Sequence, residues 1–144
     1  MKNILFLCKN NVFRSRIAEI FFNKYNKNRK YRASSAGLMP WTKKDLMKDL
    51  GYIAVKKVCK DLGINLSFNS KPATSSVLKR ADIIIIVADD VPEKLIKTEQ
   101  AVNGKVLVWE ILGVKRSDKN KEKVARNTIK FIDKKVRNFV KRLR

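Results

Sequence analysis

The feature that most constrains the fold is the alternation of short apolar runs with stretches of helical periodicity along the chain. The apolar runs have the length of buried strands and lie at residues 3–7, 31–36, 83–87 and 105–109. When helices join successive strands in this way, the strands are parallel and the helices cover both faces of the sheet. The sequence therefore predicts an α/β fold, with a doubly wound, four-stranded parallel sheet flanked by helices on both faces. A length of 144 residues fits a single domain over residues 1–144.

Helices are predicted where apolar residues recur every three or four positions. One helix starts near Arg14, a second ends at Gly63, a short one lies within residues 70–80, and a long amphipathic one fills the C-terminal segment. The apolar positions of the three longer helices are Ile17, Ile20, Phe21 and Tyr25, then Val55, Val58, Cys59 and Leu62, and finally Ala125, Ile129, Ile132, Val136, Phe139 and Leu143. Cys59 belongs to such a stripe, so we expect it to be a buried packing residue.

Residue counts exclude several kinds of functional site. The chain has no histidine, which excludes Ser-His-Asp and Cys-His catalysis and histidine metal sites. Two cysteines, Cys8 and Cys59, are too few for a disulfide framework or a four-ligand zinc site. The longest apolar run, at residues 83–88, is far shorter than a membrane span, and the N-terminus has no long apolar segment. We therefore expect a cytoplasmic protein with no metal and no membrane partner.

The net charge is strongly positive. Lys and Arg number 34 against 13 Asp and Glu, which gives a net charge of +21. Such a potential attracts polyanions and speeds the encounter with anionic substrates. A solvated lysine-rich helix surface explains the same composition, and no basic motif interleaved with aromatic residues is present. Nucleic acid is therefore kept as an alternative partner, but it is not the favoured one.

The motif with the most chemical content is Cys-x5-Arg-Ser at residues 8–15, directly between the first predicted strand and the first helix. Five residues between Cys8 and Arg14 can form a concave loop whose backbone N–H groups converge on one anion. The helix start adds the positive end of its dipole, and the planar fork of Arg14 can bind two phosphoryl oxygens. These donors favour the thiolate of Cys8, a nucleophile that needs no histidine base. Ser15 can donate to that thiolate, and Asn11 can brace the loop.

A resemblance to a known family begins at residues 4–19, which read ILFLCKNNVFRSRIAE. This segment resembles the start of the low-molecular-weight protein tyrosine phosphatase family, which is shared with arsenate reductases and protein-arginine phosphatases. The similarity continues in order through SAG at 35–37, Trp41, GINLS at 63–67 and RADIIIIVADD at 80–90. It covers nearly the whole chain up to the fourth predicted strand.

The resemblance implies a cysteine-dependent protein tyrosine phosphatase that works through a phosphocysteine intermediate. The family's nucleophile matches Cys8, its phosphoryl-binding arginine matches Arg14, and an aromatic wall of its substrate cleft matches Trp41. The implied phosphate-binding loop consists of Lys9, Asn10, Asn11, Val12, Phe13, Arg14 and Ser15. The implied substrate is a phosphotyrosine-containing protein or a small aryl phosphate, and phosphate, sulfate or vanadate is expected to bind in the loop. The family uses no metal or organic cofactor, so none is expected here.

Four positions depart from the family pattern. The glycine two residues after the nucleophile is Asn10 here, and Asn is the ordinary residue that best tolerates a left-handed backbone. Phe13 replaces a frequent second cysteine, and Arg16 replaces the proline after the Arg-Ser pair. The family's general acid lies in an Asp-Pro pair after the fourth strand, and no such pair occurs there. We predict that Asp118 is the acid, with Glu110 as the alternative.

Other interpretations of the same residues stay open. Asp118 also suits a helix N-cap, and the aspartate that matches Asp89 braces the loop in the family. Phosphoarginine hydrolysis resembles a subfamily with Thr at the position of Val12. Arsenate reduction needs further cysteines, and only Cys59 is available. The missing Asp-Pro pair and the net charge are also compatible with a basic binding module that keeps the pocket but has weak or lost turnover.

Overall fold

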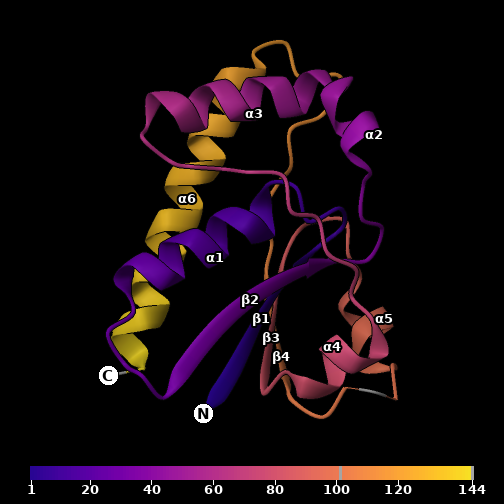
Figure 1. Cartoon of the computed structure of the whole chain (residues 1–144), viewed down its shortest axis with the longest axis vertical. Coiled ribbons are helices and arrows are strands. Elements are labelled where there is room, and N and C mark those ends of the chain that lie inside the picture. The colour runs from indigo at the N-terminus through magenta and orange to yellow at the C-terminus, as the bar shows by residue number, and fades with distance from the viewer. Residues whose placement is uncertain (101, 144) are drawn as a thin grey trace.

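The computed structural model describes residues 1–100 and 102–143. Its centre is a sheet of four parallel strands in the order β2-β1-β3-β4 (Figure 1). The strands are β1 (Lys2–Cys8), β2 (Tyr31–Gly37), β3 (Ile83–Val87) and β4 (Lys105–Trp109). All four apolar runs of the sequence form strands, so the predicted four-stranded parallel sheet is confirmed.

Within the described residues, helices cover both faces of this sheet. They are α1 (Arg14–Tyr25), α2 (Lys43–Met47), α3 (Leu50–Asp61), α4 (Ser75–Arg80), α5 (Glu93–Lys97) and α6 (Lys121–Arg142). Helices α1, α3 and α6 lie on one face and α4 and α5 on the other, which confirms the doubly wound arrangement (Figure 1). The sequence pattern does not predict α2 and α5, because helices of five residues are too short to show a repeating apolar stripe. No helix in the described part of the chain is both long and apolar enough to cross a bilayer.

Alternate residues of the central strand β1 pack into two separate cores. Ile4 and Phe6 belong to the core beneath α1, α3 and α6, whereas Leu5 and Leu7 belong to the core beneath α4 and α5. All four side chains are at most 2% exposed. The continuous apolar run in the sequence therefore reflects a strand that is buried on both faces. Because β1 is held from both sides, its last residue, Cys8, has a fixed position.

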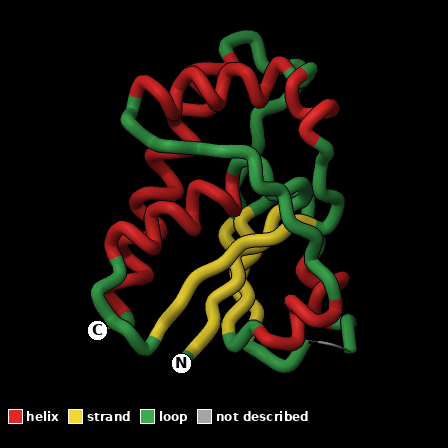
Figure 2. The backbone as a smooth tube through the Cα atoms, in the orientation of Figure 1, coloured by secondary structure: helices red, strands yellow, loops and turns green. Residues whose placement is uncertain are grey.

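The carboxyl ends of all four strands meet at one edge of the sheet, near the centre of the molecule (Figure 2). The chain passes from β1 to β2 on one side and then crosses to β3 on the other side of β1. Ligands of doubly wound sheets bind outside the carboxyl ends of the strands where the order reverses in this way. The loop that begins at Cys8 leads from this edge into α1.

Candidate active site

The loop from Cys8 to Arg14 lines a cavity of about 380 Å³ at this edge of the sheet. Its backbone is left-handed at Asn11, whose φ of 54° is the only positive φ of a non-glycine residue in the described chain. Gly37, which is paired with Cys8 in the β1–β2 register, lets the loop lie directly against β2. A Cβ atom at Gly37 would come within 2.8 Å of the Asn10 carbonyl carbon and the Asn11 nitrogen. The curvature of the loop therefore depends on Asn11 and Gly37 together.

The left-handed position differs from the one that the family comparison suggests. It falls at Asn11, whereas Asn10, which stands where the family has glycine, has no positive φ. The side chain of Asn10 instead donates from Nδ2 to the Met39 carbonyl over 2.7 Å. Its own carbonyl accepts a hydrogen bond from Ser70 Oγ, also over 2.7 Å. Glycine is therefore not required at position 10, and the asparagine anchors the loop to its neighbours.

A chain of buried hydrogen bonds orients the groups around the Cys8 sulfur. Asn11 Oδ1 accepts from the Lys71 backbone N–H over 2.9 Å, which fixes Nδ2 as the donor end of the amide. Nδ2 then donates to Ser15 Oγ over 2.7 Å. Ser15 Oγ lies 2.9 Å from Cys8 Sγ, and its O–H donates to the sulfur when Cys8 is a thiolate, because a thiolate can only accept. The two side-chain hydrogen bonds of Asn11 brace the loop.

The Cys8 sulfur lies at the bottom of the cavity and faces hydrogen-bond donors. The residue is only 2% exposed, yet it is one of the residues that line the cavity. The Asn11 backbone N–H donates to Sγ over 3.2 Å, in addition to the Ser15 hydroxyl. Both groups therefore face a free thiol that lines the cavity.

Arg14 begins α1 and is held at the carboxyl ends of β3 and β4. Its Nη1 donates to Asp89 Oδ1 over 3.0 Å and to the Ile111 carbonyl over 2.9 Å, and Nη2 donates to Asp90 Oδ1 over 3.1 Å. The pairing with Asp89 is the loop-bracing contact predicted from the sequence. Nε makes no hydrogen bond within the described residues, so its N–H is available to a ligand. Gly113 packs directly on this group, since a Cβ there would lie 3.3 Å from Arg14 Cζ.

The walls of the cavity combine aromatic and charged side chains. Trp41, the expected wall of the substrate cleft, lines the cavity together with Tyr52, Val12 and Phe13. Lys9 and Lys115 bring positive charge to it, and the carboxylates that line it are Asp49, Asp89 and Asp90. The loop residues Lys9, Asn10, Val12, Phe13 and Arg14 all contribute to the lining, while Asn11 and Ser15 lie behind it and are fully buried.

Asp118 and Glu110, the two predicted acids, are not among the residues that line this cavity. The Asp118 carboxylate accepts the Lys115 backbone N–H over 2.6 Å, and the Asp118 N–H donates to the Lys115 carbonyl over 3.1 Å. These two bonds close a turn at residues 115–118. Asp118 is not the N-cap of α6 either, because Asn120 holds that position and accepts from the Lys123 N–H. In the structure, Asp118 therefore shapes a loop and does not face Cys8.

Two residues that line the cavity, Lys115 and Asp49, are not predicted as site residues from the sequence. Lys115 lies in a polar stretch without periodicity, and its backbone N–H is held in the turn that Asp118 closes. Asp49 has a local signal, because it stands immediately before a helix and caps it by accepting from the Tyr52 N–H over 2.8 Å. That signal predicts a cap, and the same side chain also borders the cavity.

The second cysteine is remote from this chemistry. Cys59 is 1% exposed and packs in the core beneath α1, α3 and α6, whereas Cys8 packs in the core on the other face of the sheet. Burial raises the pKa of the Cys59 thiol to about 11. The predicted packing role of Cys59 is confirmed, and the sheet separates the two thiols.

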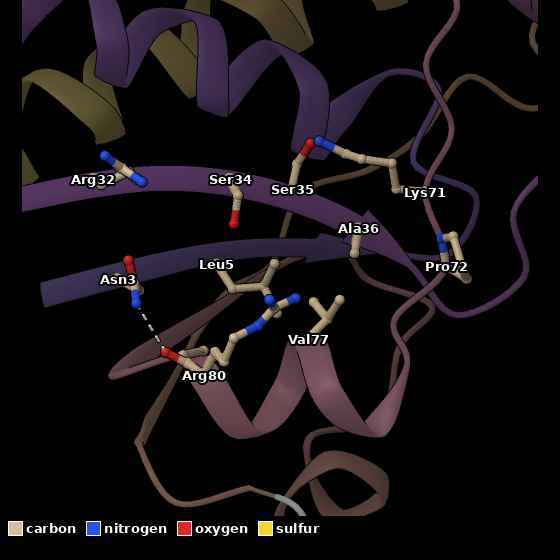
Figure 3. A pocket seen from close by; sticks show the side chains of 11 residues that line it. Asn3, Leu5, Arg32, Ser34, Ser35, Ala36, Lys71, Pro72, Val77 and Arg80 are labelled. Atoms are coloured by element: carbon tan, nitrogen blue, oxygen red, sulfur yellow. Dashed lines mark hydrogen bonds between the residues drawn. The ribbon is translucent and has the colours of Figure 1, made fainter.

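A further groove, of about 360 Å³, runs along β2 on the face that carries α4. Arg32, Lys71 and Arg80 bring positive charge to it, and the Arg80 side chain extends from the end of α4 toward the sheet (Figure 3). Asn3 ties the groove to α4 by donating to the Arg80 carbonyl over 3.2 Å. No cysteine lines this groove, so the nucleophile places the candidate active site in the cavity at Cys8.

Comparisons with known proteins agree with this geometry. Residues 3–144 match the family model described as "Low molecular weight phosphotyrosine protein phosphatase". The chain belongs to the low molecular weight phosphotyrosine protein phosphatase family. No curated protein sequence matches it.

Solved structures of proteins with different named activities have folds similar to that of this chain. A protein tyrosine phosphatase from Entamoeba histolytica has a TM-score of 0.72 and 24% identity, covering 99% of this chain and 97% of its own. The YwlE arginine phosphatase from Geobacillus stearothermophilus has a TM-score of 0.74 and 14% identity, covering 99% and 93%. An arsenate reductase from Archaeoglobus fulgidus has a TM-score of 0.67 and 21% identity, covering 95% and 98%. At these identities the likeness shows the shared fold.

Proposed function

We propose that this chain is a cysteine-dependent phosphomonoester hydrolase that acts on phosphotyrosine. The observation that supports the proposal most directly is the environment of Cys8 Sγ, which contacts the Asn11 N–H and the Ser15 hydroxyl at the start of the loop that lines the cavity. Family membership supports the same assignment. The proposal requires no metal ion and no organic cofactor.

The reaction proceeds in two displacements at phosphorus. In the first, the Cys8 thiolate attacks, an S–P bond forms, and the P–O bond to the tyrosine oxygen breaks as that oxygen takes a proton. In the second, water attacks the phosphocysteine, its proton passes to a base, and phosphate leaves as the thiolate is restored. The loop N–H groups and Arg14, which lines the cavity, stabilise the charge on the phosphoryl oxygens. Free phosphate, sulfate or vanadate should occupy the same position.

The proton donor for the leaving oxygen is Asp118 in the sequence-based proposal. Because its carboxylate accepts the Lys115 N–H, donation requires the 115–118 turn to open toward the cavity. Asp90 is the competing donor, since it lines the cavity already and its side chain is 44% exposed. The same position in the cavity also fits the role of the base that activates water.

The walls of the cavity support an aromatic substrate. Trp41 and Tyr52 offer flat apolar faces on which a phenyl ring can stack. A phosphotyrosine-containing protein or a small aryl phosphate is therefore the proposed substrate. We propose a cytoplasmic location as well, because a nucleophilic thiol has to remain reduced and both cysteines are free.

The other activities of the family fold lack a supporting observation of this kind. A thioredoxin-linked arsenate reductase needs a second thiol to resolve the first, and Cys59 lies in the core on the opposite face of the sheet from Cys8. An arginine phosphatase activity would use the same Cys8 and Arg14. Phosphoarginine and arsenate are therefore included as alternative substrates in the test, together with phosphate binding without turnover.

The test measures hydrolysis of p-nitrophenyl phosphate, a phosphotyrosine peptide and a phosphoarginine peptide, and thioredoxin-linked reduction of arsenate, by the wild type, Cys8→Ser and Cys59→Ser. We expect Cys8→Ser to lose turnover but keep vanadate binding, because Arg14 and the loop amides remain. Cys59→Ser is the matched control and should retain turnover, since its thiol is remote from the cavity. Equal hydrolysis by Cys8→Ser and the wild type would exclude the phosphocysteine mechanism. Vanadate binding without turnover of any substrate would instead support a binding module.

A further inference from the structure

A second cavity, of about 540 Å³, adjoins the candidate active site and shares Trp41 and Asp49 with its lining. Besides these two residues it is bordered by Lys48, Arg116 and Lys121, and by Asp45. It lies between the α2–α3 connection and the segment that leads from β4 to α6, which approach each other near the top of Figure 1. Any group attached to a substrate that extends past Trp41 in this direction enters it.

The acidic residues of this second cavity are already engaged by the backbone and side chains of their own helices. Asp45 Oδ2 accepts from Thr42 Oγ1 over 2.8 Å, as part of the N-terminal cap of α2. Asp49 Oδ1 accepts from the Tyr52 N–H over 2.8 Å and caps α3. Both carboxylates are thus held at helix starts, and among the described residues neither forms an ion pair with the cations of the cavity.

The cations of this cavity, in contrast, have unused capacity. Among the described residues, the Arg116 guanidinium and the Lys48 ammonium make no ion pair and no hydrogen bond, and both residues are exposed. Lys121 donates from Nζ to the Arg116 carbonyl over 2.9 Å and to the Asp118 carbonyl over 2.8 Å, so it holds the segment that presents Arg116. The cavity therefore offers two free positive groups to a ligand.

The 115–118 turn divides positive charge between the two cavities. Asp118 closes this turn by accepting the Lys115 N–H over 2.6 Å, and Lys121 braces it from α6. The consecutive residues Lys115 and Arg116 then line different cavities: Lys115 the one that contains Cys8, and Arg116 its neighbour. This arrangement gives Asp118 a positioning role that does not depend on proton donation.

We propose that the second cavity binds an anionic group carried by the substrate beside its phosphorylated residue. The group is a carboxylate of a neighbouring Asp or Glu, or a second phosphate, and Arg116 and Lys48 recognise it. The inference rests on the proposed function, because it assumes that a phosphorylated side chain occupies the cavity at Cys8. It adds the substrate class: phosphoproteins whose phosphorylated residue is flanked by negative charge.

The test compares four phosphotyrosine peptides that differ only in the flanking residue, which is Glu, phosphoserine, Ala or Lys. One exposed ion pair changes an equilibrium by about 1.4–5-fold, so two cations should raise kcat/KM for the Glu and phosphoserine peptides about 2–25-fold over the Ala peptide. Comparison of the Glu and phosphoserine peptides identifies which anion is preferred. The preference should weaken as salt rises, since exposed charges are screened.

Variants locate the effect. Arg116→Glu and Lys48→Glu should remove or reverse the preference for anionic peptides while leaving p-nitrophenyl phosphate hydrolysis unchanged, because that substrate does not reach the second cavity. Lys119→Glu is the matched control: it makes the same charge change in the same loop, at an exposed residue that lines neither cavity. It should keep the preference. An equal loss of preference in Lys119→Glu would show a general charge effect and overturn the proposal.

The outcome separates this inference from the proposed function. Turnover of all four peptides at equal kcat/KM overturns the anion site and leaves the phosphatase assignment intact. If the wild type turns over none of them, the proposed function fails, and the Kd values of Cys8→Ser for the same peptides are compared by fluorescence anisotropy. Tighter binding of the Glu or phosphoserine peptide, lost in the Cys8→Ser, Arg116→Glu double variant, supports the anion site. Equal Kd values for the anionic and Ala peptides overturn it.

Discussion

Substitutions at Asn11 separate the two ways in which this residue stabilises the phosphate-binding loop. Asn11→Gly adopts the φ of 54° freely but loses two hydrogen bonds, one from the Lys71 N–H and one to Ser15 Oγ. At about 1 kcal/mol for each bond and ~0.5–1 kcal/mol for the larger unfolded-state entropy of glycine, the free energy of unfolding should fall by about 2.5–3 kcal/mol. Asn11→Ala loses the same bonds and adds ~1–2 kcal/mol of left-handed strain, for a loss of about 3–4 kcal/mol.

The order of the two variants is the informative result. At Asn11 alanine should be the more destabilising substitution, although alanine is normally the better tolerated of the two. The matched control is the same pair of substitutions at Asn10, where the backbone is not left-handed and both variants lose the same bond to the Met39 carbonyl. There, glycine should be more destabilising by about 0.5–1 kcal/mol.

Urea unfolding of the four variants and the wild type at neutral pH measures these differences. The alkylation rate of Cys8 by iodoacetamide provides a functional measurement, because both Asn11 variants release the Ser15 hydroxyl from its orientation toward Sγ. If Asn11→Ala is more stable than Asn11→Gly, the left-handed assignment is wrong. If both equal the wild type in stability, the bonds to Lys71 and Ser15 contribute nothing and the argument for the loop fails.

Three further outcomes follow from the geometry. Arg14→Lys should lower kcat/KM for p-nitrophenyl phosphate by about 10²–10³-fold. One ammonium cannot keep the bonds to Asp89, Asp90 and Ile111 and also bind phosphoryl oxygens. Unchanged kinetics would show that Arg14 does not bind the phosphoryl oxygens. Asp118→Asn and Asp90→Asn are compared on aryl phosphates whose leaving groups differ in acidity. Loss of the proton donor should slow hydrolysis of substrates with poor leaving groups by about 10²–10⁴-fold and of activated substrates little. If a variant slows phosphotyrosine hydrolysis less than about threefold, the substituted residue is not the donor. Burial raises the pKa of Cys59 from 9.0 to about 11, so the folded state retains the proton and the free energy of unfolding should decline as pH rises through that range. Urea unfolding between about pH 8 and 11 measures this decline, which Cys59→Ala should flatten, and an equal slope in the variant would contradict the assignment.

The four strands and their alternation with helices along the chain could be predicted because the apolar runs are local and strong signals. The runs at β1 and β3 are apolar at consecutive positions, and burial on both faces explains why. Helices α2 and α5 could not be predicted from periodicity, since each has five residues. Their caps are visible in the sequence, as with Thr42, which accepts from the Asp45 N–H, but a cap residue alone does not distinguish a helix from a turn.

The candidate site divides in the same way. Cys8, Arg14 and the loop between them are close in sequence, and their spacing carries the prediction. The position of Asp118 in the structure could not be predicted from its place in the sequence before α6. Its carboxylate accepts the Lys115 N–H in a turn that no apolar pattern signals. The left-handed backbone falls at Asn11, one residue after Asn10, where the sequence predicts it. The close packing of Gly37 against Asn10 and Asn11 fixes the backbone there.

Arg14 shows why such contacts matter for the chemistry as well as for the fold. Its partners Asp89, Asp90 and Ile111 stand at the ends of β3 and β4, 75 to 97 residues away in sequence. They engage Nη1 and Nη2, and Nε makes no hydrogen bond within the described residues. A phosphoryl group that binds at Nε would leave these contacts in place, and a charge held in a fixed position stabilises a transition state most effectively. The arginine therefore fastens the phosphate loop to the sheet edge and, through the same contacts, is prepared for the phosphoryl group.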